Sequence, residues 1–382
     1  MSRVFFLLSC YGLYLRVWLS QFQEKLWNLV RATKYRTLTK GLSNPSTLLF
    51  LYYPNAIAES QLYPFHVYRK KLLQSFALEL KACPIDEWSQ RATEESWQPK
   101  IIIIQSHFHI NHQSLATVCS QLKSHYPKAK IVFFDWFAAS DLRLASTVEP
   151  FIELYVKKTV FVDVGQYRTR YFGDTNLMDY YGHLYQCQHE KQQYDVPQGI
   201  GKKLTTGIGF ISAPYLHSLF SRAERPKNQR PIDINARFAT RGSDWYSAMR
   251  SVALNKAIGL SADYAVAHGS LPRAQYLREL GQSKVTFSPF GYGEICWRDY
   301  EAMALGSLLI KPDMSHLEVN PDIFIPYETY IPLAWDLSDF DEKVIHYLSS
   351  PAERLQITKN AFEVGHQFVR HGKFIDHVKD LI

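Results

Sequence analysis

The stretch from residue 284 to residue 311 constrains the fold more than any other part of this chain of 382 residues. It combines a short β-forming run, a loop with two glycines, a strongly helix-forming segment and a second apolar run. In order, these are the predicted strand 284–288, the glycines Gly291 and Gly293, the predicted helix 294–305 ended by Gly306, and the predicted strand 307–311. This order predicts a strand–helix–strand unit of a parallel sheet.

The glycine loop of this unit has the features of an anion-binding site. Gly291 and Gly293 lack a Cβ, so the backbone can come close to a ligand. The helix that follows presents free N–H groups and the positive end of its dipole, which suits a diphosphate. Glu301 lies two turns into the helix, where its carboxylate can accept hydrogen bonds from ribose hydroxyls. Counting back by helical periodicity, we expect Glu294 and Arg298 on the same helical face as Glu301.

Strand-like and helix-like segments alternate along the rest of the chain. The other predicted strands are 48–53, 101–104, 131–134, 232–238 and 263–267, and the other predicted helices are 66–82, 113–124, 244–258, 272–280 and 352–371. We therefore predict an α/β protein of two Rossmann-like domains that face each other across a cleft, with ligands at the carboxyl ends of the strands. The predicted domains are 46–220 and 231–382, joined by a charged, proline-containing linker over 221–231.

The basic character of the chain is confined to its N-terminal segment. The formal net charge is +7, of which residues 1–40 hold +6 and the remainder +1. Because the chain outside residues 1–40 is nearly neutral, it has no extended basic surface for nucleic acid, and we expect no nucleic acid partner. Residues 1–45 also carry a helical apolar stripe with two tryptophans, Trp18 and Trp27. This amphipathic helix either packs on its own domain or lies on an anionic membrane surface.

Cysteine usage and hydropathy bear on location. The five cysteines are widely spaced, and no run of about 18 apolar residues occurs. We expect a cytoplasmic protein without disulfides or a zinc site, which can associate peripherally with the inner face of a membrane.

Three histidines follow the most apolar predicted strand. His107, His109 and His112 lie after 101–104, at the end of a strand where ligands commonly bind. A histidine that is neutral near pH 7 can serve as a general base toward a hydroxyl, so His107 and His109 are candidate catalytic residues. Asp135, after the strand 131–134, is the alternative base. A metal-dependent hydrolase that uses the three histidines is a rival hypothesis.

The segment Glu301-Ala-Met-Ala-Leu-Gly306 resembles the donor-nucleotide motif of the GT-B glycosyltransferases, in which this glutamate holds the ribose. Retaining members of that family have another glutamate eight positions earlier. Here that position is Gly293, and the nearest acid is Glu294, so the stereochemistry of transfer stays open. The spacing from Arg298 to Glu301 is similar to that of the exostosin-type C-terminal domain. The resemblance spans residues 231–382 and, more loosely, the whole chain.

This resemblance implies a transferase that moves a hexosyl or related group from a nucleotide-diphosphate sugar to a hydroxyl acceptor, a glycan or a lipid-linked glycan. The donor-binding residues we expect are Arg237, Gly291, Tyr292, Gly293, Glu294, Arg298, Glu301 and Lys311. The sole Asp-x-Asp pair, Asp339 and Asp341, precedes a predicted helix and is expected to cap it. We therefore expect neither a metal nor another cofactor. A non-catalytic nucleotide-sugar-binding or glycan-binding protein of the same fold is the second rival hypothesis.

Overall fold

The computed structural model describes residues 45–94, 97–222 and 229–381. The amphipathic helix predicted within residues 1–45 falls almost entirely outside these ranges, as do residues 223–228 of the predicted linker. Below, residues 46–222 are called the first half and residues 229–381 the second half. No helix of the described ranges is both long enough and apolar enough to span a membrane.

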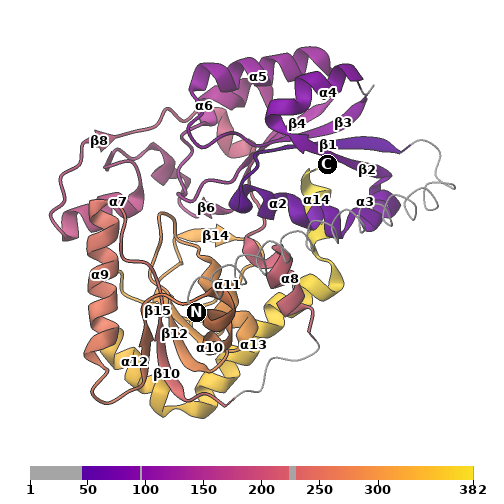
Figure 1. Ribbon diagram of the computed structural model, residues 1–382. Coiled ribbons are helices and arrows are strands. Elements are labelled where there is room, and N and C mark those ends of the chain that lie inside the picture. Colours follow the sequence, from indigo (N-terminus) through magenta and orange to yellow (C-terminus); the bar gives the residue numbers. More distant parts are fainter. Residues whose placement is uncertain (1–44, 95–96, 223–228, 382) are drawn as a thin grey trace, which may run out of the picture. The chain divides into compact units, whose positions relative to one another are not determined.

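The first half contains a sheet of six strands, each parallel to its neighbours (Figure 1). In spatial order the strands are β2 (Leu78–Pro84), β1 (Ser46–Tyr52), β3 (Pro99–Ile104), β4 (Lys130–Asp135), β5 (Leu154–Lys157) and β9 (Leu204–Thr206). The helices of this half are α2 (Ala56–Val67), α3 (Arg69–Phe76), α4 (Trp88–Glu94), α5 (His112–His125), α6 (Ala145–Val148), α7 (Asn176–Leu184) and α8 (Pro214–Phe220). The central strands are apolar and buried on both faces, as in other parallel sheets covered by helices.

The second half contains a sheet of five strands, also parallel throughout. In spatial order they are β11 (Val266–His268), β10 (Ile232–Ala236), β12 (Ser283–Phe287), β13 (Leu308–Pro312) and β15 (Ile331–Leu333). The helices are α9 (Asp244–Gly259), α10 (Arg273–Leu280), α11 (Trp297–Leu305), α12 (Phe340–Ser349), α13 (Pro351–His371) and α14 (Phe374–Leu381). The predicted α/β class with two Rossmann-like parts is confirmed.

Two short strand pairs and a few isolated bridges complete the pairing of the described residues. An antiparallel pair joins β6 (Thr159–Phe161) of the first half to β14 (Leu317–Val319) of the second, and β7 (Tyr171–Phe172) pairs with β8 (Lys191–Gln192). One of these bridges links Ile208 and Asn320.

The helix predicted over 66–82 is wrong in its second part. The left-handed residue Ala77 ends α3, and residues 78–84 form strand β2, which pairs with β1 from Ser46 opposite Leu78 to Tyr52 opposite Pro84. Because β2 is an edge strand, Glu79 and Lys81 keep contact with water, and their charges hide the strand pattern in the sequence. Pairing with β1 therefore overrides the local helix propensity.

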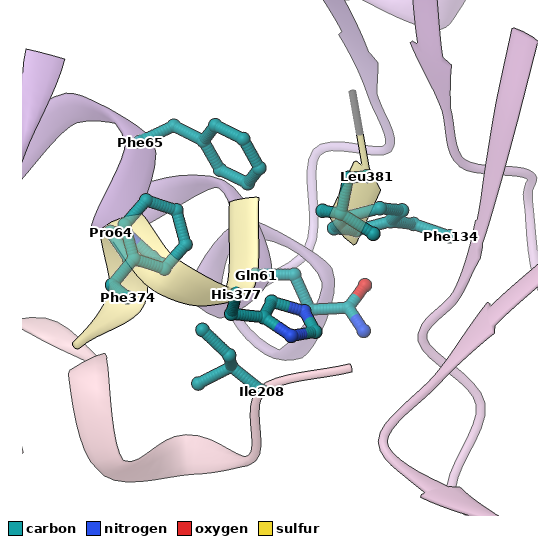
Figure 2. Close-up of a pocket in the computed structure, with 8 residues that line it drawn as sticks. All are labelled: Gln61, Pro64, Phe65, Phe134, Ile208, Phe374, His377 and Leu381. Carbon is teal, nitrogen blue, oxygen red and sulfur yellow. The ribbon is translucent and has the colours of Figure 1, made fainter. Parts of the chain in front are cut away.

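The last helix, α14, was not predicted, and it packs on the first half (Figure 1). The Phe374 ring lies 4.9 Å from that of Phe65 and 5.4 Å from that of Tyr68. Figure 2 shows a cavity of about 10 Å³ at this junction, room for about one water molecule. It is lined by Gln61, Pro64, Phe65, Phe134, Ile208, Phe374, His377 and Leu381. Burial lowers the pKa of His377 to about 4, so a neutral imidazole faces this cavity at pH 7.

The strand orders decide where ligands can bind. In each sheet the chain leaves the first strand toward one side and returns on the other, so that β1 and β3, or β10 and β12, are neighbours with diverging connections. Ligands of doubly wound sheets bind at the carboxyl ends of such a strand pair. The residues that follow β3 include the histidine run, and those that follow β12 are the glycine loop. Both predicted sites therefore lie at topological switch points.

Candidate functional site

The glycine loop, residues 288–296, is fixed to the start of α11 by one buried carboxylate. Cys296 is the N-cap of α11, and its N–H donates to the Asp299 carboxylate at 2.9 Å. The same carboxylate accepts from the hydroxyl of Ser288 at 2.6 Å and from the ammonium of Lys311 at 2.7 Å. Lys311 was predicted to bind the donor, but it is fully buried and paired with Asp299. Its position therefore favours a role in holding the loop.

Glu294 lies in the loop and not on the helix, because α11 begins only at Trp297. The prediction that Glu294 shares a helical face with Glu301 is therefore wrong. The Glu294 carboxylate is completely buried and accepts from the Ser140 hydroxyl and the Asn176 amide, both at 2.9 Å. Burial alone would raise its pKa, but His316, at 3.6 Å, and these donors together lower it. Glu294 thus links the glycine loop to two segments of the first half.

Gly293 is required by a close approach to the first half. A Cβ at this residue would lie 1.8 Å from the carbonyl oxygen of Ala138, so no other residue fits without a backbone shift. The close approach predicted for this glycine exists, but its partner is Ala138. Beside it, the Tyr292 side chain is half exposed, and its ring stacks on that of Tyr246 at 4.5 Å. Tyr292 therefore remains a candidate for stacking on a nucleotide base.

Two arginines next to the glycine loop have no carboxylate partner among the described residues. Arg250 is 4% exposed, and its guanidinium donates to the carbonyl oxygens of Phe290 at 2.8 Å and Ala239 at 3.0 Å. Arg298 donates to the Arg237 carbonyl at 3.1 Å and to the Ser288 hydroxyl at 3.2 Å. Burial lowers the pKa of Arg250, which shows the cost of keeping this charge out of water. Within the described ranges, neither guanidinium is therefore compensated by a direct carboxylate contact.

Arg237, in contrast, is already paired. It lies directly after β10, as predicted, and its guanidinium forms a two-point ion pair with Glu279, with Nη2 2.8 Å from Oε2. A third contact joins it to the carbonyl oxygen of His268. An anion that binds to Arg237 would have to compete with Glu279.

Glu301 lies on α11 as predicted and is nearly buried. Its two carboxylate oxygens accept from the hydroxyls of Tyr215, at 2.7 Å, and Tyr276, at 2.8 Å. Burial and the adjacent carboxylate raise the pKa of both tyrosines, so both hydroxyls stay protonated and donate. Arg273 approaches the carboxylate to 4.0 Å and lies over the Tyr215 ring. Glu301 is thus a carboxylate whose oxygens point toward hydroxyl donors.

In the first half, His107 is hydrogen-bonded to the Asp86 carboxylate. Its Nε2 lies 2.7 Å from the Asp86 carboxylate, and its ring lies 4.5 Å from the Tyr53 ring. Asp86 belongs to a short turn of 3₁₀-helix that follows β2, so three strand ends meet at this histidine. The His107 side chain remains about a third exposed, at 37%, and so is open to a substrate. A carboxylate that holds one imidazole nitrogen leaves the other to act as a base.

Tyr53, which contacts His107, belongs to a group of four aromatic side chains that we call the aromatic platform: Tyr53, Phe108, Trp136 and Phe137. The Tyr53 and Trp136 rings stack at 5.5 Å, and the Phe108 and Phe137 rings lie 4.9 Å apart. Phe108 is 47% exposed. The next residue after the platform, Ala138, is the one that contacts Gly293. The platform and the glycine loop are therefore adjacent.

The other predicted catalytic residues have different surroundings. His109 is exposed beside Phe108, and Nδ1 of His112 lies 2.5 Å from the Thr147 hydroxyl. Within the described ranges, no group of three or more His, Cys, Asp or Glu side chains is arranged to hold a metal ion. Asp135 is buried, and its carboxylate accepts from Lys157 and from the Tyr155 hydroxyl, both at 2.7 Å. This geometry favours a structural role for Asp135.

Sequence reasoning missed Asp86 and Arg250. Arg250 lies among the apolar residues of α9, between Tyr246 and Ala253 on its buried face, and an arginine on an apolar stripe is a signal that could have been read. Asp86 was missed because β2 was predicted as helix, so that no strand end was expected beside it.

Comparison with known protein families finds a match in the second half of the chain. Residues 222–378 match a family model described as "Glycosyl transferase-like". No curated protein is significantly similar in sequence. Similar solved structures include an alpha-glucosyltransferase (AGT) in complex with UDP (10% identity, 86% of this chain and 98% of that chain, TM-score 0.48). Others are a glycosyltransferase from Rickettsia africae (9%, 87% and 98%, TM-score 0.49) and a sucrose-phosphate synthase from Thermosynechococcus elongatus (11%, 88% and 100%, TM-score 0.45).

Proposed function

We propose that the chain transfers a hexosyl or related group from a nucleotide-diphosphate sugar to a hydroxyl acceptor, because residues 222–378 match the glycosyl transferase-like family model. The observation that carries this proposal is the uncompensated charge of Arg250 and Arg298 at the glycine loop. Buried cations are usually paired, and a diphosphate would supply the missing negative charge.

The donor would bind along α11. Its diphosphate would lie near the amino end of the helix, where Arg298 and the Nη2 of Arg250 border the loop. Its ribose hydroxyls would reach Glu301, in place of or beside the hydroxyls of Tyr215 and Tyr276. Tyr292, half exposed, would stack on the base.

The acceptor would bind at the aromatic platform. Of its rings, Phe108, 47% exposed, and the half-buried Tyr53 reach solvent. These two would bind the apolar face of a sugar in a glycan or a lipid-linked glycan. His107, held by Asp86, would take the proton of the attacking hydroxyl as the sugar–phosphate bond breaks. The positive charge at the glycine loop would stabilise the departing diphosphate. Because the chain itself supplies these cations, the proposal requires neither a metal nor another cofactor.

The net charge of residues 1–40 supports a peripheral membrane location at a cytoplasmic surface. Co-sedimentation of the full chain with anionic vesicles, weakened by salt and absent with neutral vesicles, is the expected result. Equal binding to both vesicle types would remove this part of the proposal.

A thermal-shift screen of the full chain against UDP, GDP, ADP and CMP tests the donor assignment. A ligand that binds only the folded state raises the unfolding midpoint. We expect at least one nucleoside diphosphate to raise it in proportion to its concentration. No shift with any of the four, at millimolar concentration, would contradict a nucleotide-dependent transferase.

A further inference from the structure

Lys158 is a buried lysine without a partner. It lies between β5 and β6, is 3% exposed, and makes no hydrogen bond or ion pair with any described residue. Its ammonium lies over the Phe210 ring, 4.8 Å from the ring centre. The adjacent Lys157 and the more distant Lys311 are buried to the same degree, but each is paired with an aspartate. Lys158 is thus an exception among the buried lysines of the described ranges.

Such a position is costly without a ligand. An ammonium on a side chain that is only 3% exposed loses most of its hydration, and among the described residues only the face of one ring replaces it. Burial, together with the neighbouring charge of Lys157, lowers the pKa of Lys158 to about 7, against the opposing influence of Asp135 and Cys296. An anionic ligand would remove this cost.

The surroundings of Lys158 lead to the amino end of α11. The Phe210 ring stacks on that of Trp297, the first residue of α11, at 4.1 Å and 20°. Cys296, the N-cap of this nine-residue helix, is near enough to act on the charge of Lys158. At this end a capping box joins Cys296 and Asp299, in which the Cys296 side chain accepts from the Asp299 N–H. The N–H groups of Trp297 and Arg298, the first two residues of the helix, remain to attract an anion. An unpaired cation and a helix amino end therefore converge on one place.

We propose that Lys158 binds the diphosphate of the sugar donor, so that the first half of the chain contributes directly to the donor site. This inference rests on the proposed function. The ammonium would donate to phosphate oxygens together with Arg298, whose guanidinium contacts Ser288 of the loop. The donor would then be held by both halves.

Proton uptake gives this proposal its own signature. The charged and titratable groups that act on Lys158 are Lys157, Asp135 and Cys296, from β5, β4 and the N-cap of α11. Without ligand, Lys158 is largely neutral at pH 8, since its pKa lies near 7. A phosphate beside the amine favours its charged form, and the terminal phosphate, with a pKa of about 6, is already ionised at this pH. Binding at pH 8 should therefore take up about one proton from the solvent.

The test is calorimetric titration of the full chain with UDP, GDP and ADP at pH 8, in two buffers of different ionisation enthalpy. Wild type is compared with Lys158→Met, which removes the amine at similar volume, and with Lys202→Met, an exposed lysine of the same half. We expect Lys158→Met to bind about 10-fold to 100-fold more weakly, the loss typical of a charged hydrogen bond. We also expect the buffer dependence to disappear in Lys158→Met and to persist in Lys202→Met.

The outcomes separate the two proposals. If wild type binds none of the three nucleotides, the proposed function fails and this inference fails with it. If wild type and Lys158→Met bind with equal affinity and equal proton uptake, the inference alone is wrong. Should Lys158→Met not fold, Lys158→Gln, which keeps a polar end, gives the same comparison.

Discussion

Two clusters of buried charge lie at the carboxyl ends of the two sheets, and they differ in balance. At the ends of β4 and β5, Lys157 and Asp135 neutralise each other, with a tyrosine hydroxyl completing the set. At the glycine loop after β12, the hydrogen bonds that Arg250 and Arg298 make to described residues go to carbonyl and hydroxyl oxygens, and none goes to a carboxylate. A balanced pair is complete within the protein. In the unbalanced cluster the loop also holds the buried Glu294 carboxylate, but this group is hydrogen-bonded to the first half and contacts neither arginine. A bound anion would give Arg250 and Arg298 the charged partner that they lack, and this difference is what assigns a ligand to the glycine loop.

We expect the largest effect from a substitution that removes one partner of the balanced Lys157–Asp135 pair. Lys157→Met should lower the free energy of unfolding by about 3–5 kcal/mol, because it leaves the Asp135 carboxylate buried and unpaired. Urea unfolding measures this. Lys158→Met is a matched control, since the adjacent lysine is equally buried but unpaired, and it should cost little or even stabilise the protein. Equal losses in the two variants would contradict the distinction between the clusters.

The second largest effect is expected when a positive charge is removed from the unbalanced cluster. Arg250→Met should weaken nucleoside diphosphate binding by about 2–5 kcal/mol, since a desolvated phosphate would lose a buried charged partner. Calorimetry of the variant beside Arg278→Met, an exposed arginine on α10, makes the comparison. An Arg250→Met protein that is folded by circular dichroism and binds as tightly as Arg278→Met would remove Arg250 from the site.

A smaller loss is expected at the ribose position. Glu301→Gln keeps the shape of the side chain but removes its charge, which should cost about 1.5–3 kcal/mol of donor affinity. The nucleoside diphosphate and its 2′,3′-dideoxy analogue are titrated into wild type and variant. If wild type already binds both ligands equally, Glu301 does not hold the ribose.

Removal of divalent metal ions is expected to have no effect on nucleotide binding. Because arginines supply the positive charge at the loop, affinity for the nucleoside diphosphate should be the same in EDTA as in Mn²⁺ or Mg²⁺. Loss of binding in EDTA, with recovery on adding one of these ions, would show that the cluster is completed by a metal.

Local sequence predicted the elements of this site better than its contacts. The strand, helix and strand around Glu301 form as expected, and Gly306 adopts the left-handed conformation that ends the helix. The start of that helix was misplaced because it depends on the Asp299 side chain, which caps Cys296. Helix-forming residues alone do not mark such a cap.

Long-range contacts account for the rest. Glu294 is buried by Ser140 and Asn176, which are 154 and 118 residues away in sequence. No local pattern around Glu294 indicates either partner. His107 was predicted from its place after a strand, but its partner Asp86 follows an edge strand whose charged residues hid it. Contacts between segments that are distant in sequence decided both cases.

The central claim is that the charge at the glycine loop is kept for a diphosphate. Calorimetric titration of the full chain with UDP, GDP and ADP, each beside its parent nucleoside, tests this most directly. The account predicts that one diphosphate binds at least about 100-fold more tightly than its nucleoside, and that salt weakens this binding. A nucleoside that binds as tightly as its diphosphate, with no dependence on salt, would contradict it.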